Sequence, residues 1–139
     1  MKGLFLDAVD GLADVFARVV RPDDPPVTVN VQEQVHPEEL PKLLAGYDFV
    51  LDDHSQMPTE AMRQCSGLKH IIFLGTGARS YMHPEELAEL GITVHTYKGY
   101  GDTAVAEHSI ALMWAAARGV ARMDRGMREG NWLRSDGLQ

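Results

Sequence analysis

Short apolar runs alternate with stretches of helical periodicity along the first hundred residues of this 139-residue sequence. Strands are predicted for the apolar runs at residues 3–7, 27–31, 49–51, 70–74 and 93–97. Strands that alternate with helices form parallel sheets, which the helices cover on both faces. We therefore expect residues 1–100 to form an α/β domain with a flavodoxin-like parallel five-stranded sheet and helices on both faces.

The motif His-Pro-Glu-Glu-Leu occurs twice, at residues 36–40 and 83–87. Proline at the first helical position and acidic side chains in the first turn are general signals for the start of a helix. We therefore interpret both copies as helix starts, and we expect these helices to end at Gly46 and Gly91. Further helices are predicted over residues 12–20 and 58–65.

Residues 101–139 form a second predicted region, a hinge followed by a long crossover helix from Asp102 to about Met127. Apolar residues at helical spacing make two stripes on neighbouring faces of this helix. A small sheet cannot cover both stripes, so a further domain or a second subunit is expected to pack there. We expect a homodimer or higher oligomer through residues 103–127, with Trp114, Met113 and Val120 in the interface.

Composition excludes several classes of function. The formal net charge of −7 opposes binding to nucleic acid. The single cysteine, Cys65, cannot form an internal disulfide, and the six histidines lack metal-ligand spacing, so no metal is expected. No apolar stretch resembles a signal peptide or is long enough to cross a membrane. We therefore expect a cytoplasmic protein without a membrane partner.

The loops after the predicted strands are the candidate binding site, because ligands of open parallel sheets lie beyond the carboxyl ends of the strands. One such loop, GTGARS at residues 75–80, fails as a dinucleotide fingerprint since Ser80 replaces the third glycine. It is either an ordinary turn or an anion-binding nest of backbone amides, to which Arg79 adds positive charge. Asp52, Asp53 and His54 form either a solvated loop or an acid–base and substrate-contact cluster.

A second constellation suggests a different class of protein. Strand ends carry Asp7, Asp52 or Asp53, Thr76 and Lys98, as in the phosphorylation site of response-regulator receiver domains. A stand-alone receiver-like signalling domain is therefore one alternative, and a binding or oligomerisation module is another. Asp7 lacks the adjacent acid typical of receivers, and Lys98 precedes glycine rather than proline.

From Leu68 to Trp132 the sequence resembles the D-isomer-specific 2-hydroxyacid dehydrogenase family. The resemblance lies in the segments LKHIIFLGTGARSY and ELGITVHTYKGYGDTAVAEHSIALMWAAAR and in the Gly-Asn-Trp tail at residues 130–132. It implies an NAD- or NADP-dependent oxidoreductase acting on a small D-2-hydroxy or 2-keto acid. The GVDN that usually continues the turn is ARS here, and an arginine common after the third strand is Asp52, which argues against a second anionic group on the substrate.

The resemblance also implies which residues contact the ligands. Substrate contacts are implied at Thr76, Gly77, Asp53, His54, Ser55 and Gly101. Cofactor contacts are implied at Thr76, Asp102 and Thr103. The catalytic arginine, glutamate and histidine of the family, and its dinucleotide-binding loop, are expected beyond Gln139. We therefore expect this chain to be the substrate-binding portion of a truncated enzyme. On its own it is expected to be inactive and not to bind the cofactor.

Overall fold

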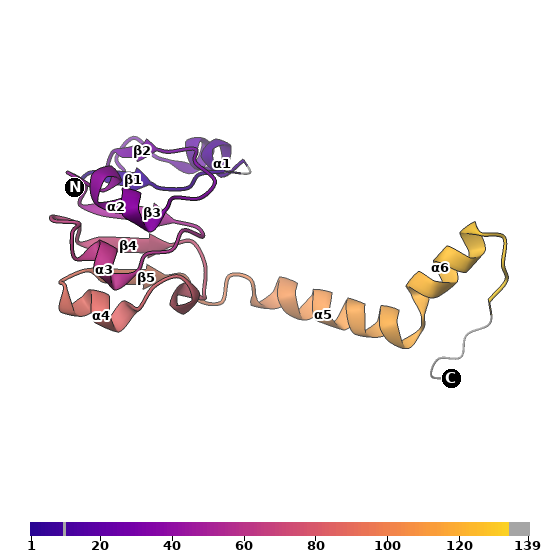
Figure 1. The fold of residues 1–139 in the computed structure, drawn as a ribbon. Helices are drawn as coiled ribbons and strands as arrows, with labels where there is room; N and C mark the ends of the chain where they lie inside the picture. The colour runs from indigo at the N-terminus through magenta and orange to yellow at the C-terminus, as the bar shows by residue number, and fades with distance from the viewer. Residues whose placement is uncertain (10, 134–139) are drawn as a thin grey trace. The chain divides into compact units, whose positions relative to one another are not determined.

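The computed structural model describes residues 1–9 and 11–133, and its sheet has five parallel strands in the order β2-β1-β3-β4-β5 (Figure 1). The strands are β1 (Gly3–Phe5), β2 (Val27–Val29), β3 (Phe49–Asp52), β4 (His70–Phe73) and β5 (Thr93–Thr96). Every pairing is parallel, so the carboxyl ends of all five strands share one edge of the sheet. The predicted α/β class and flavodoxin-like topology are confirmed.

Helices lie on both faces of this sheet. The larger core joins Leu4, Val50 and Ile71 of the strands to the helices that follow β2, β3 and β4. These helical segments are η1 (Pro37–Glu39), α2 (Leu40–Leu43), α3 (Thr59–Met62), η2 (Ala78–Ser80) and α4 (Pro84–Glu89). Phe5, which alternates with Leu4 in β1, instead contacts Phe16 of α1 (Leu12–Val19) with ring centroids 5.8 Å apart. Successive strand residues point to opposite faces, so α1 covers the face away from α2–α4.

The first His-Pro-Glu-Glu-Leu motif starts a helix as predicted, but the helix is shorter and less regular than expected. The 3₁₀ turn η1 comes first, and the α-helical part ends at Leu43. Pro41 explains the irregularity because it lacks an N–H and its ring crowds the carbonyl four residues earlier. The second motif starts α4 at Pro84, and Gly91 follows it in a left-handed conformation.

Residues from Gly99 onward form a separate compact unit, and residues 1–98 form the other. The single helix expected up to Met127 is instead two helices, α5 (Asp102–Ala117) and α6 (Val120–Arg128). Gly119 interrupts them with a φ of +61°, a left-handed conformation that glycine adopts at little cost. No residue of α5 is buried, and Val105, Ile110 and Trp114 are each more than half exposed. No helix within the described residues is long and apolar enough to cross a membrane.

Candidate functional site

The glycine loop after β4 presents unpaired backbone amides at the carboxyl edge of the sheet. Thr76 and Gly77 are exposed, and neither N–H has a hydrogen-bond partner among the described residues. At Gly75 a Cβ would lie 2.7 Å from the Phe73 ring, so this position requires glycine for packing. At Gly77 a Cβ would meet nothing within 4 Å, and the space beside the backbone is open to a ligand. Neighbouring free amides of this kind bind carboxylate or phosphate oxygens.

A hollow of about 300 Å³ lies beside these amides, lined by residues of the β4 and β5 ends and the start of α4. The hollow has two cationic side chains, Arg79 and Lys98, of which only Arg79 has an ion-pair partner in the described part of the chain. Arg79 pairs with Glu85 through both terminal nitrogens, with 2.8 Å from Nη1 to Oε2. This pairing raises the pKa of the guanidinium and offsets its charge. Lys98 has no ion pair among the described residues, so it supplies the uncompensated positive charge of the hollow.

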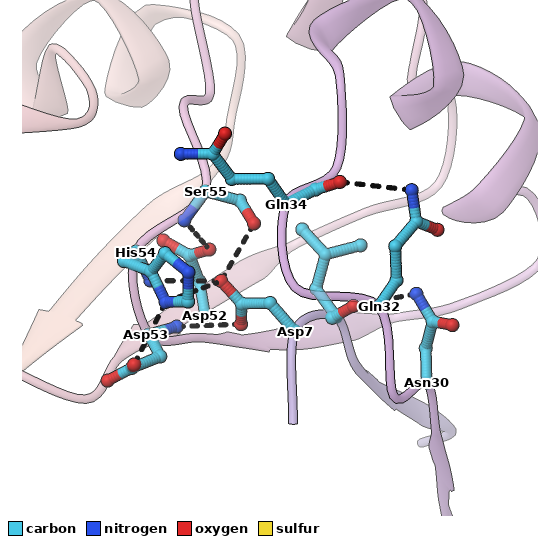
Figure 2. A network of polar contacts seen from close by, with 9 residues as sticks. Asp7, Asn30, Gln32, Gln34, Asp52, Asp53, His54 and Ser55 are labelled. Carbon is cyan, nitrogen blue, oxygen red and sulfur yellow. Dashed lines mark hydrogen bonds and ion pairs between the residues drawn. The ribbon is translucent and has the colours of Figure 1, made fainter. Parts of the chain in front are cut away.

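A network of polar contacts lies at the ends of β1 and β3, next to β4 in the sheet (Figure 2). At its centre the fully buried carboxylate of Asp7 accepts three hydrogen bonds from the loop after β3. The backbone N–H groups of Asp53 and His54 donate at 2.9 Å each, and the Ser55 hydroxyl donates at 2.7 Å. Three hydrogen bonds to one buried side chain hold the loop against it, so Asp7 fixes the path of this loop.

Asp52 is the second fully buried acid of the network. Its Oδ1 accepts the Ser55 N–H at 3.1 Å, whereas its Oδ2 has no hydrogen-bond partner among the described residues. Burial, followed by the nearby charge of Asp7, raises the pKa of Asp52 to about 8. Asp52 is therefore mostly protonated at neutral pH.

His54 and Asp53 form the partly exposed rim of the network. The ring Nδ1 of His54 lies 3.0 Å from Oδ2 of Asp53 and 3.6 Å from Oδ2 of Asp7. The hydrogen bond with Asp53 is the main cause that raises the pKa of His54. The ring nitrogen Nδ1 is thus directed at two carboxylates of the protein, which favour the protonated ring.

The expected site residues fall into three groups in the structure. Thr76 and Gly77 line the hollow, and Asp53 and His54 form the neighbouring rim. Ser55 has 0% exposure and holds the loop on Asp7, a different environment from the expected substrate contact. The remaining expected residues, Gly101, Asp102 and Thr103, belong to the second unit, where Gly101 is the N-cap of α5.

Two residues of this site, Asp7 and Lys98, are not among the ligand contacts that the dehydrogenase resemblance implies. Asp7 is the anchor of the β3 loop, and Lys98 is the cation of the hollow. The available signal was their position, since each residue lies two positions beyond the end of a strand, β1 for Asp7 and β5 for Lys98. The same geometry disfavours the receiver alternative, because Asp52 is fully buried and Asp53 is paired with His54.

Comparison with known proteins identifies a class of proteins that share this fold. Over 107 residues the chain is 32% identical to a D-3-phosphoglycerate dehydrogenase of Archaeoglobus fulgidus, covering 76% of this chain and 20% of that protein. No family model matches the sequence.

Solved dehydrogenase and reductase structures share the fold. An acyclic imino acid reductase in complex with NADPH and D-Arg superposes with a TM-score of 0.77 at 22% identity, covering 94% of this chain and 41% of the reductase. A D-2-hydroxyisocaproate dehydrogenase superposes with a TM-score of 0.74 at 16% identity, covering 95% of this chain and 40% of the enzyme.

These matches define a dehydrogenase-type α/β fold. The resemblance to the D-isomer-specific 2-hydroxyacid dehydrogenase family, indicated by the sequence motifs, is confirmed in sequence and in fold. The chain spans about a fifth of the curated relative and about two fifths of the solved structures.

Proposed function

We propose that this chain is the substrate-binding portion of an NAD(P)-dependent oxidoreductase that interconverts D-2-hydroxy acids and 2-keto acids. The observation that carries the proposal is the pair of unpartnered amides at Thr76 and Gly77 beside the unpaired Lys98. Two N–H donors and one cation suit the carboxylate that every 2-hydroxy acid carries. Asp53 and His54 border the bound acid, while Ser55 and Asp7 keep their loop in place.

The nicotinamide cofactor would supply the hydride acceptor for the oxidation. Thr76, Asp102 and Thr103 carry hydroxyl or carboxylate groups, and we assign cofactor contacts to them as the family resemblance implies. The 139 residues of this chain contain no GxGxxG loop, the usual cradle of a dinucleotide pyrophosphate. We therefore propose that the 139-residue protein alone binds the acid but does not transfer hydride. NADH oxidation by the purified protein with any of several 2-keto acids would contradict this part.

Carboxylate binding can be tested by titrating the ¹⁵N-labelled protein with D-lactate and following backbone amide shifts by NMR. We expect saturable shifts at Thr76 and Gly77. Gly77→Val should keep the fold, because the added side chain meets open space, but should weaken binding about tenfold by occupying the ligand's position.

A separate variant tests whether the positive charge of Lys98 contributes to binding. Lys98→Gln should weaken D-lactate binding, whereas Lys42→Gln, an exposed charge removal on α2, should not. Shifts spread over the whole surface, or equal affinities for both lysine variants, would count against the site.

We also propose that two or more copies associate through α5. The basis is the apolar surface that α5 exposes, at Val105, Ile110, Leu112, Met113 and Trp114. Contiguous exposed apolar side chains are typical of surfaces that bind other proteins.

A further inference from the structure

We propose that this site selects monoanionic 2-hydroxy and 2-keto acids whose far end is a hydrogen-bond donor or a cation, with Asp53 as the specificity-determining residue. Acids with a second carboxylate or a phosphate would be disfavoured. The inference rests on the proposed function, because it assumes that the substrate carboxylate lies at Thr76 and Gly77.

The two halves of the site lie on neighbouring strands. In the register of the sheet Asp52 of β3 pairs with Phe73 of β4, so the loop with Asp53 and the glycine loop start side by side. Adjacent strands are about 4.8 Å apart. A carboxylate held by Thr76 and Gly77 therefore places the rest of a small acid within reach of Asp53.

Charge is divided unequally between these halves. The β4 and β5 side carries Lys98 and the paired Arg79. The β1, β2 and β3 side carries Asp7, Glu33, Asp52, Asp53 and His54 and has no lysine or arginine in residues 3–9, 27–35 or 49–58. Glu33 is exposed, and its backbone carbonyl raises the pKa of His54. With Asp52 protonated, this side is still net negative at neutral pH even when His54 is charged.

Acceptor capacity remains unused on the acidic side. Asp53 is 36% exposed and uses Oδ2 for His54, and its Oδ1 has no partner among the described residues. The Nδ1 of His54 is not available to a ligand, because it faces the carboxylates of Asp53 and Asp7. An ammonium, guanidinium or hydroxyl group on the ligand complements Asp53, whereas a second anion meets repulsion.

Both types of ligand occur among proteins similar to this chain. The relative from Archaeoglobus fulgidus is named for a phosphorylated acid, and the imino acid reductase was solved with D-Arg, which is cationic. The charges beside β3 in this chain favour the second type.

The test is an NMR titration with three four-carbon D-2-hydroxy acids that differ only at the far carbon: malate, 2,4-dihydroxybutyrate and 4-amino-2-hydroxybutyrate. We expect 4-amino-2-hydroxybutyrate to bind about tenfold more tightly than malate, with the dihydroxy acid between them. The far ends of malate and the amino compound differ by two unit charges, and each interacts with Asp53 across solvent at about 5 Å. Equal affinities for malate and the amino compound would overturn the inference while leaving the proposed function intact. If D-lactate and all three acids leave the Thr76 and Gly77 amides unshifted, both proposals fail.

Variants assign the selectivity to one residue. Asp53→Asn should bring the malate and amino-compound affinities within about twofold, and Asp53→Lys should reverse their order. Asp23→Asn removes an exposed acid from the loop before β2, at the opposite edge of the sheet, and should leave the ratio unchanged. An Asp53→Asn protein with the wild-type ratio would overturn the assignment.

Discussion

The hydroxyl of Ser55 donates a 2.7 Å hydrogen bond to the carboxylate of Asp7, which lies 48 positions earlier in the sequence. Two backbone N–H groups of the same loop reach the same carboxylate. One buried side chain at the end of β1 therefore determines the conformation of the loop that carries Asp53 and His54. The geometry of the proposed specificity site therefore depends on a residue that is itself fully buried.

Asp7→Asn should destabilise the protein by about 2–4 kcal/mol, because an amide offers one acceptor oxygen and turns an NH₂ toward donors that the carboxylate satisfied. The free energy of unfolding from urea titration at pH 7 measures this change. Asp14→Asn on α1 is the control, since Asp14 is exposed, and it should change the free energy by less than about 0.5 kcal/mol. Equal effects of the two substitutions would show that Asp7 does not anchor the loop.

Asp52 should make stability depend on pH between about 4 and 8. Its pKa rises from 3.8 in the unfolded chain to about 8 in the folded protein, so the folded state binds the proton more tightly. This contribution to stability is complete below pH 3.8 and is lost as pH rises toward 8, with a slope of up to about 1.4 kcal/mol per pH unit.

Asp52→Asn retains a neutral side chain of the same shape and should remove that dependence. The variant should gain about 4 kcal/mol relative to wild type between pH 5 and pH 8, measured by urea unfolding at intervals of one pH unit. Asp23→Asn, an exposed substitution, should follow the wild-type curve. Parallel curves for wild type and Asp52→Asn would mean that Asp52 is ionised throughout this range.

The fold was predictable because its determinants are local. Continuous apolar runs indicate strands such as residues 70–73. Because these strands alternate with helices along the chain, a parallel sheet is the simplest arrangement. The position of the glycine loop at the end of the fourth strand was predictable for the same reason, and its role as an anion nest is a proposal. The anchoring of the β3 loop was not, since Asp7 meets its partners across 46–48 residues of sequence. The break at Gly119 was missed because apolar periodicity continues on both sides of it.

Gly119→Ala should join α5 and α6 into one longer helix. Alanine disfavours the φ of +61° at this position and favours the helical conformation by about 1 kcal/mol. Space does not oppose the change, because the nearest atom to an added Cβ is Arg122 Nε at 3.8 Å. Helical Cα chemical shifts at residues 117–120 and a stronger 222 nm circular dichroism signal would show that α5 and α6 form one continuous helix.

The control for this prediction is Gly91→Ala, another left-handed glycine with open space around it. It lies between α4 and β5, so it cannot extend a helix and should only destabilise, by about 1 kcal/mol. A Gly119→Ala protein that loses stability without gaining helix would show that tertiary contacts, rather than glycine, set the break.

Trp114→Lys should abolish association of the protein if α5 is the interface. Trp114 is 59% exposed on a helix that buries none of its residues, and large aromatic side chains contribute strongly when an interface covers them. We expect sedimentation velocity to show dimers or larger assemblies of wild type at micromolar concentration and monomers of the variant. Trp132→Lys is the matched control, because Trp132 is 81% exposed but lies outside α5. A monomeric wild-type protein, or equal loss of association in both variants, would remove α5 as the interface.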